Sequence, residues 1–329
     1  MMGLSILDRW VWDFWLAQNG AEQHIFYLQA PRSLIDPDLR HHRATVGHAV
    51  SLDFEHWRLL PDALGPGAPG EWDDMAIWTG SVLGHPGEWR MLYTGISKVE
   101  DGRVQRIGLA ESNDLVHWEK HGENPVMEAD PRWYQRIGKG SAPDEAWRDP
   151  YLVAAGSDGV SHALITARAI GQPAHAAGTI GHARSTDLIS WEVLPPLAAP
   201  AEFAQMEVPQ LLGSADGPVA VLFSCRAADH SEARKQRPGV QACSGTFVMW
   251  APRLSGPWVV SDVPIGAGTP FGPLYAGKVV TNVHGDPAFM GFLADDAEFT
   301  GDILGPFVGP EFALPGPITS RAATSSGPD

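Results

Sequence analysis

Short runs in which apolar and polar residues alternate recur along the whole chain, and turn-forming residues separate them. The clearest runs are HIFYLQA (24–30), WRMLYTG (89–95), SHALITA (161–167) and VAVLFSC (219–225). Runs of this length, rich in aromatic and β-branched residues, are typical of β-strands. The 36 Gly and 28 Pro residues are spread along the chain, where they break up long helices and favour tight turns. The pattern predicts an all-β protein.

One twelve-residue pattern occurs three times: an apolar residue, Gly, x, Ala, x, Ser, x, Asp, an apolar residue, x, x and Trp. Its copies are VGHAVSLDFEHW (46–57), IGLAESNDLVHW (107–118) and IGHARSTDLISW (180–191). We interpret Gly-x-Ala-x-Ser as a strand whose small residues pack closely against the next sheet. Ser-x-Asp then makes a turn through side-chain-to-backbone hydrogen bonds, and the Trp begins the following outer strand.

The spacing of the copies predicts how many units the protein has. The final Trp residues stand 61 and 73 residues apart, and a fifth of the 329-residue chain is about 66 residues. Weaker signals at 245–258 and 286–301 supply a fourth and a fifth unit. Four-stranded units around an axis form a β-propeller. We therefore expect a five-bladed β-propeller with a central axial pocket over residues 1–312, and a poorly ordered C-terminal tail over 313–329.

Charge and hydropathy exclude several classes of partner. The chain carries 23 basic and 39 acidic residues, a net charge of −16. This balance favours solubility and argues against binding to nucleic acids or to anionic membranes. No apolar stretch approaches the ~20 residues of a membrane helix. The N-terminus, MMGLSILDRWVWDFW, does not have the pattern of a signal peptide. We expect a cytoplasmic protein, although a secreted precursor trimmed of its leader would have the same appearance.

No cofactor or metal is expected. The 13 His residues include no HExxH or other ligand pattern, so no zinc site is predicted. The two cysteines, Cys225 and Cys243, favour a pair of buried free thiols over a single bridge. The acidic cluster of Asp295, Asp296 and Glu298 is interpreted as a solvated loop rather than a calcium site. The basic cluster of Arg234, Lys235 and Arg237 is interpreted as an exposed loop between strands.

Three acidic residues stand in apolar, strand-like surroundings, where a carboxylate is costly unless it has a role. Asp13 lies in WVWDFW, Asp149 in AWRDPYLV and Glu207 in QMEVPQLL. Singly, they could cap a turn, form an internal ion pair or point to solvent. Together they lie at the entrances to the inner strands of three different blades, so a propeller would bring them to one end of its axis. Hydrolysis of a glycoside needs such carboxyl groups.

At these residues the chain resembles glycoside hydrolase families 32 and 68, the invertase, inulinase and levansucrase group, and more distantly family 43. VGHAVSLDFEHW is close to the family 32 stretch WGHAVSKDLVHW, and HIFYLQAP resembles HLFYQYNP. WVWDFW is more similar to VWDSWP of family 68. IWTGS (77–81), WRDP (147–150) and EVP (207–209) resemble the WSGS, FRDP and ECP or ERP motifs. Leu28 stands at the Gln of the FYQ motif, and we expect no C-terminal β-sandwich of the kind usual in family 32.

The resemblance implies a role for each of these residues. Asp13 would be the nucleophile, Asp149 the transition-state stabiliser and Glu207 the acid/base. His48 is expected to be structural rather than catalytic. The implied sugar contacts are Trp10 or Trp12, Trp78, Thr79 and Arg148.

Three functions remain open from the sequence. The first is a retaining hydrolase of terminal β-fructofuranosyl or similar furanoside residues, with transfructosylation as an accompanying reaction. The second is an inverting α-L-arabinofuranosidase-like enzyme of the family 43 type. The third is a sugar-binding propeller without catalysis. Retention predicts carboxyl groups of Asp13 and Glu207 about 5–5.5 Å apart, with the pKa of Glu207 above that of Asp13.

Overall fold

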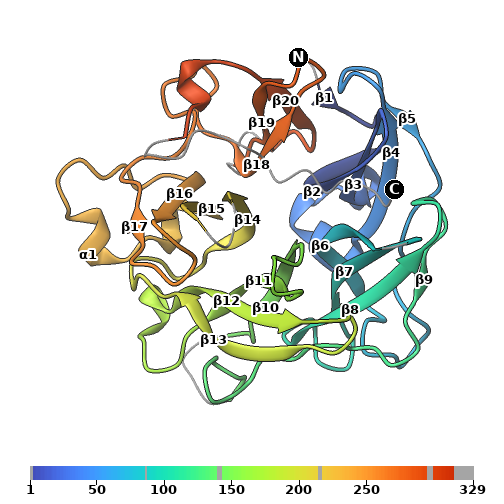
Figure 1. Cartoon of the computed structure of the whole chain (residues 1–329), viewed down its shortest axis with the longest axis horizontal. Helices are drawn as coiled ribbons and strands as arrows, with labels where there is room; N and C mark the ends of the chain where they lie inside the picture. The colour runs from blue at the N-terminus through green and yellow to red at the C-terminus, as the bar shows by residue number, and fades with distance from the viewer. Residues whose placement is uncertain (1–2, 86, 139–142, 214–216, 295–298, 315–329) are drawn as a thin grey trace.

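A computed structural model describes residues 3–85, 87–138, 143–213, 217–294 and 299–314. In this part of the chain, twenty β-strands form five antiparallel sheets of four strands each. The sheets stand around a central axis as the blades of a propeller, each with one strand nearest the axis (Figure 1). The expected five-bladed, all-β architecture is confirmed.

Each blade runs outward from its inner strand. Blade 1 consists of β2 (Arg9–Asn19), β3 (Glu22–Pro31), β4 (Thr45–Ser51) and β5 (Arg58–Leu59). Blade 2 consists of β6 (Ala76–His85), β7 (Glu88–Ile96), β8 (Gln105–Ser112) and β9 (Glu119–Lys120). Blade 3 consists of β10 (Trp147–Val153), β11 (Ser161–Arg168), β12 (Gly178–Ser185) and β13 (Glu192–Ala198).

The last two blades complete the ring, and the N-terminal strand takes part in blade 5. Blade 4 consists of β14 (Glu207–Gly213), β15 (Val219–Cys225), β16 (Gly245–Ala251) and β17 (Val259–Val260). Blade 5 consists of β18 (Tyr275–Thr281), β19 (Pro287–Phe292), β20 (Ile303–Phe307) and, as its outermost strand, β1 (Gly3–Leu4). Gly3 pairs with Leu304 and Leu4 with Ile303, so the N-terminal strand completes the last blade. The sequence pattern does not reveal this closure.

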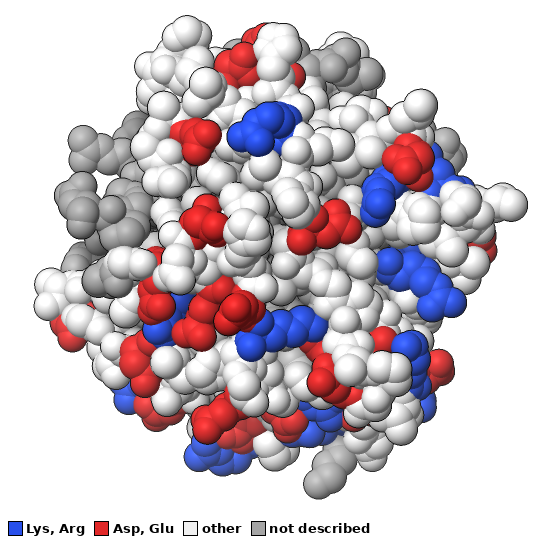
Figure 2. Space-filling model, turned by 90° about the vertical axis from the view of Figure 1, so that its right-hand side faces the viewer, with Lys and Arg blue, Asp and Glu red and all other residues white. Residues whose placement is uncertain are grey.

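The helical segments are short and lie between strands. They are η1 (Arg32–Leu34), η2 (Pro37–Arg43), η3 (Ala174–Ala176), η4 (Ala227–Asp229), η5 (Pro310–Phe312) and α1 (Glu232–Lys235). None of the helices in the described residues is long and apolar enough to span a membrane. On the face shown in Figure 2, acidic and basic side chains are interspersed rather than gathered by sign.

The threefold sequence pattern forms the third strand of blades 1, 2 and 3 and the turn to the fourth. In all three turns the Ser hydroxyl accepts the N–H of the Asp, and the Asp carboxylate accepts the N–H three residues further on. The Trp directly precedes the fourth strand. The glycine makes room within its own blade rather than for the next sheet. A Cβ on Gly47 would lie 2.3 Å from the Tyr27 ring, and one on Gly108 would lie 2.6 Å from the Tyr93 ring.

The basic cluster lies between two strands, as expected, with Lys235 exposed and Arg237 half-buried, but the expectation of a solvated loop is wrong for Arg234. Arg234 belongs to α1 and is only 1% exposed. Its guanidinium lies over the ring of Phe203, pairs with Glu202 and donates to the Ser261 carbonyl at 2.6 Å. A planar cation can be buried when its N–H groups are satisfied in this way. The acidic cluster, Asp295, Asp296 and Glu298, lies outside the described residues.

Neither Cys225 nor Cys243 forms a disulfide, as expected, but only Cys225 is buried, and Cys243 is half-buried. His48 is fully buried on β4, where it stacks on Phe26 and hydrogen-bonds to His24 at 2.9 Å, the structural position expected for it. Of the predicted C-terminal tail, residues 315–329 lie outside the described residues.

Candidate active site

Every inner strand is interrupted by a β-bulge at the same level of the axis. The pairing with the second strand shifts register directly after the residues Trp12, Trp78, Arg148, Glu207 and Tyr275. The next residue in each strand is the bulged one: Asp13, Thr79, Asp149, Val208 and Ala276. Four of these five have positive φ angles, between 26° and 54°. Because a bulge redirects side chains, each blade presents two consecutive residues at this level.

These residues form the axial pocket. Its volume is about 240 Å³, and nine of the ten bulge-level residues line it, Ala276 being the exception. Glu207 begins its inner strand, as expected, whereas Asp13 and Asp149 lie within theirs, beyond the strand entrances where the sequence placed them. They are also not strictly equivalent. Asp13 and Asp149 are the bulged residues of blades 1 and 3, but Glu207 occupies the preceding position, which Arg148 occupies in blade 3.

Three hydroxyl groups fasten neighbouring blades together beside the pocket. Thr94, Thr166 and Ser224 stand on second strands, paired with Trp78, Arg148 and Glu207. Each hydroxyl accepts the N–H of the bulged residue in the next blade, with distances of 3.0 Å for Asp149, 3.2 Å for Val208 and 2.8 Å for Ala276. The equivalent residues in blades 1 and 5 are Leu28 and Phe292, which have no hydroxyl.

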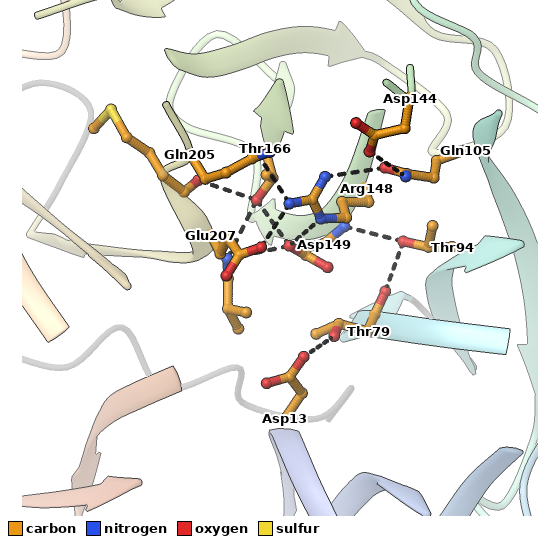
Figure 3. Close-up of polar contacts among 12 residues, drawn as sticks. Asp13, Thr79, Thr94, Gln105, Asp144, Arg148, Asp149, Thr166, Gln205 and Glu207 are labelled. Carbon is orange, nitrogen blue, oxygen red and sulfur yellow. Dashed lines mark hydrogen bonds and ion pairs between the residues drawn. The ribbon is translucent and has the colours of Figure 1, made fainter. Parts of the chain in front are cut away.

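Asp13 has fewer hydrogen-bond partners among the described residues than Asp149 or Glu207. Its carboxylate accepts one hydrogen bond, from the Thr79 hydroxyl at 2.9 Å (Figure 3). Burial raises the pKa of Asp13 to about 7, and the negative charges of Asp149 and Glu207 add to the rise. A carboxyl group in this setting keeps its proton near neutral pH.

Asp149 is 5% exposed but well provided with donors. Its Oδ2 accepts hydrogen bonds from the Thr166 hydroxyl at 2.9 Å and from the Val208 N–H at 3.3 Å. The Arg148 Nε lies 3.5 Å from the same oxygen. Burial raises the pKa of Asp149, while the charge of Arg148 opposes the rise. These contacts fix the direction of the carboxylate.

Glu207 is held from two sides. Its Oε1 lies 2.6 Å from Arg148 Nη2, and its Oε2 accepts a hydrogen bond from the Tyr275 hydroxyl. Burial by itself would raise the pKa of Glu207, but the charge of Arg148 and the hydrogen bond from Tyr275 lower it below the ordinary value. Arg148 therefore connects Glu207 with Asp149, and Figure 3 shows the three side chains in one cluster facing Asp13.

The pKa order expected from the sequence is wrong for the unliganded protein, because Asp13 lies above its ordinary value and Glu207 below. The reason is that Arg148 and Tyr275 both contact the Glu207 carboxylate and stabilise its ionised form. The sequence pattern shows neither the guanidinium of Arg148 on its carboxylate nor the phenol of Tyr275, whereas Asp13 has a single hydroxyl donor. The three carboxyl groups titrate as a coupled set in which Asp13 holds the last proton.

Most of the predicted sugar contacts lie in this pocket. Trp12, Trp78, Thr79 and Arg148 line it. Trp10 does not: it packs in the core against Gly301, where a Cβ would approach the indole to 2.6 Å. Trp12 is thus the tryptophan of β2 that faces the pocket.

Several lining residues were not identified from the sequence. Two of them, Arg40 and His41, come from the short η2 segment, and burial lowers the pKa of His41 to about 3, so its ring is neutral. Tyr275 could have been found from its position in YAGK, because it heads the inner strand of blade 5 as Glu207 heads that of blade 4. The remaining unpredicted polar lining residues are Gln105, Asp144 and Arg226. No group of three or more His, Cys, Asp or Glu residues among those described is arranged to hold a metal ion.

Comparison with known proteins decides the family. The family model for the glycosyl hydrolases family 32 N-terminal domain matches residues 16–237, two thirds of the chain. The chain belongs to this family. The match includes Asp149 and Glu207 and begins three residues after Asp13.

Two sequence relatives within this family have different names. The acid β-fructofuranosidase of Phaseolus vulgaris is 40% identical over 113 residues, which are 33% of this chain and 16% of that protein. The 6(G)-fructosyltransferase of Asparagus officinalis is 36% identical over 115 residues, 33% of this chain and 17% of that protein. The aligned stretches therefore span less than a fifth of either relative.

Solved structures share the fold at low identity. An inulosucrase from Halalkalicoccus jeotgali bound to kestose has a TM-score of 0.71 at 20% identity, covering 91% of this chain and 84% of that one. Fructan 1-exohydrolase IIa from Cichorium intybus has a TM-score of 0.61 at 20% identity, covering 92% of this chain and 56% of that one. At this identity the likeness establishes the propeller fold alone.

Proposed function

We propose that this family 32 protein hydrolyses terminal β-fructofuranosyl linkages with retention of configuration, and transfers the fructosyl group when a sugar hydroxyl replaces water. The observation that supports this best is the meeting of Asp13, Asp149 and Glu207 in one pocket, with Arg148 between the last two. The names of the two sequence relatives, a β-fructofuranosidase and a fructosyltransferase, support the choice of sugar and both outcomes.

The reaction needs one proton on the pair of Asp13 and Glu207. Glu207 donates that proton to the glycosidic oxygen as the bond to the anomeric carbon breaks, and the Asp13 carboxylate bonds to the same carbon. Glu207, now ionised, takes a proton from water or from an acceptor hydroxyl, whose oxygen displaces Asp13. The sugar leaves with its original configuration.

Substrate binding must therefore move the proton from Asp13 to Glu207. Hydroxyl groups of the sugar that donate to Asp13 favour its ionised form, as a hydrogen bond to a carboxylate does. Asp149, oriented by Thr166 and Val208, is placed to accept sugar hydroxyls and to stabilise the positive charge that develops on the ring.

The size of the pocket favours attack at a chain end. Its volume of about 240 Å³ is below the ~300–1,000 Å³ of pockets that hold drug-sized ligands, which suits one sugar ring. We expect release of single fructose units from sucrose, 1-kestose and inulin. Early release of long mixed oligomers would contradict this part of the proposal.

The test is product analysis on sucrose, 1-kestose, inulin and nitrophenyl furanosides, with the first anomer identified by NMR or optical rotation. A first product of retained configuration supports the double displacement. An inverted first product would assign the family 43 type of mechanism, with Asp13 as the base that activates water. Binding of these sugars without any turnover would identify a non-catalytic propeller.

A further inference from the structure

Lys278 is a buried cation close to the acids that the mechanism above does not use. It lies on β18, is 5% exposed and is the first residue that pairs with β19 after the bulge. Its Nζ donates to the carbonyls of Val208 and Pro209, at 2.9 Å and 3.1 Å. None of the ion pairs among the described residues includes it. Burial of an ammonium group without an adjacent carboxylate is costly, so its position demands a compensating role.

The carbonyls that Lys278 holds belong to the bulge that presents Glu207. Val208 has a φ of 51°, an uncommon conformation for a β-branched residue that needs support from its surroundings. The N–H of Val208 donates to Asp149 Oδ2 at 3.3 Å and to Thr166 Oγ1 at 3.2 Å. The peptide units of this bulge are therefore fixed by blade 3 on one side and by the Lys278 ammonium on the other.

Lys278 also lies between the two ends of the axis. Beyond the bulges, the later halves of the inner strands surround a second, mainly apolar cavity, and Lys278 is the one charged residue among the described residues that line it. Burial lowers the pKa of Lys278 to about 8, and the negative charges of Asp13 and Asp149 oppose that lowering. Lys278 thus connects the second cavity with the bulge that presents Glu207.

We propose that Lys278 is a positioning residue for the reaction. Its ammonium fixes the Glu207–Pro209 bulge and compensates part of the negative charge of Asp13 and Asp149. This inference rests on the proposed function for its kinetic consequences, but its electrostatic part concerns the unliganded protein.

The charged groups that act on Lys278 or on the two aspartates determine the sign of the effect. They are Asp13 on β2, Asp149 and Arg148 on β10, Glu207 on β14 and Arg40 on η2, with the phenols of Tyr151 and Tyr275 beside them. On β6, the bulge residue at this level is the uncharged Thr79. Removal of the ammonium leaves the acids with less positive charge nearby. Asp13 should then hold its proton to higher pH.

The experiment compares Lys278→Met and Lys278→Gln with the wild type, and Lys98→Met, in which the lysine is largely exposed on another blade, is the matched control. Carbon-13 NMR titration of the carboxyl groups, assigned with Asp13→Asn in each background, should show the Asp13 midpoint at higher pH in both Lys278 variants. The proton then leaves Asp13 less readily for Glu207. We expect kcat about tenfold lower in Lys278→Met, with KM changed less than kcat.

Lys278→Gln separates the two parts of the role. Its amide is neutral but still donates to a bulge carbonyl, so the titration shift should persist while part of kcat returns. An unchanged Asp13 midpoint in a folded Lys278→Met protein would overturn the electrostatic part. Unchanged kcat would overturn the positioning part, and failure of both variants to fold would assign Lys278 a purely structural role. A wild type without turnover on any furanoside would refute the proposed function, while the titration would still test Lys278.

Discussion

Asp13 and Asp149 occupy the same position in blades 1 and 3, yet their surroundings differ at two equivalent places. The residue before the aspartate is Trp12 in blade 1 and Arg148 in blade 3. On the second strand, Trp12 pairs with Leu28 in blade 1, and Arg148 pairs with Thr166 in blade 3. Asp149 thus gains a cation and a hydroxyl where Asp13 meets an indole and an isobutyl group.

Because of this difference, aspartates at the same position in two blades differ in pKa and in how firmly they are held. Asp149 is kept in a fixed direction by Thr166, Val208 and Arg148, which suits a group that orients and stabilises. Asp13 has one donor, Thr79, and a pKa raised to about 7, so its carboxylate is poorly solvated and reactive once it loses the proton. The repeat positions both carboxyl groups, and the two neighbours decide what each does.

The largest expected effect separates the acids by role. Asp13→Asn and Glu207→Gln should lower kcat by about 10⁴-fold or more, because they remove the nucleophile and the proton donor. Asp149→Asn should cost about 10³-fold, since the stabiliser forms no bond to the sugar. Single-turnover kinetics on sucrose, with melting temperatures to show that each variant folds, is the measurement. A variant that keeps more than about a tenth of wild-type kcat would refute the role assigned to its residue.

A smaller effect is expected from making blade 3 resemble blade 1. Thr166→Val removes the hydroxyl that donates to Asp149 and accepts from Val208. A hydrogen bond to a charged group contributes about 1.5–3 kcal/mol, so kcat/KM should fall about 10- to 150-fold. Thr166→Ser keeps the hydroxyl and is the matched control. Equal kcat/KM for the valine and serine variants would show that the hydroxyl does not position Asp149.

The smallest and most specific effect comes from the reverse change in blade 1. In the wild type, the last proton of the coupled acids leaves Asp13 as the pH rises through about 7, and none then remains for Glu207 to donate. The kcat/KM of the wild type should therefore fall above about pH 7. In Leu28→Thr, a hydroxyl near Asp13 stabilises the carboxylate and lowers its pKa. In a pH profile of kcat/KM, the fall on the alkaline side should then begin at lower pH than in the wild type. Leu28→Val, which adds no hydroxyl, should leave that fall at the wild-type pH.

The candidate acids could be found from the sequence because a carboxylate in an apolar strand is costly and therefore conspicuous. Asp13, Asp149 and Glu207 all satisfy this criterion, and all three line the pocket. The partners that set their pKa values could not be found in the same way. Tyr275 and Glu207 are 68 residues apart, and nothing local in either segment indicates that their oxygens meet.

The sequence by itself determined the blades, because the alternation of apolar residues recurs along the chain, and the Ser-x-Asp turn followed by Trp recurs in blades 1, 2 and 3 as a local signal. It did not determine how the ring closes, since β1 and β20 are separated by nearly the whole chain. Only the tertiary structure decided that each inner strand bulges at one level of the axis. It also decided that Glu207 stands in register with Arg148, and that the Lys278 ammonium contacts the carbonyls of Val208 and Pro209. These are relations between blades, and they depend on contacts that form only when the five sheets pack around a common axis.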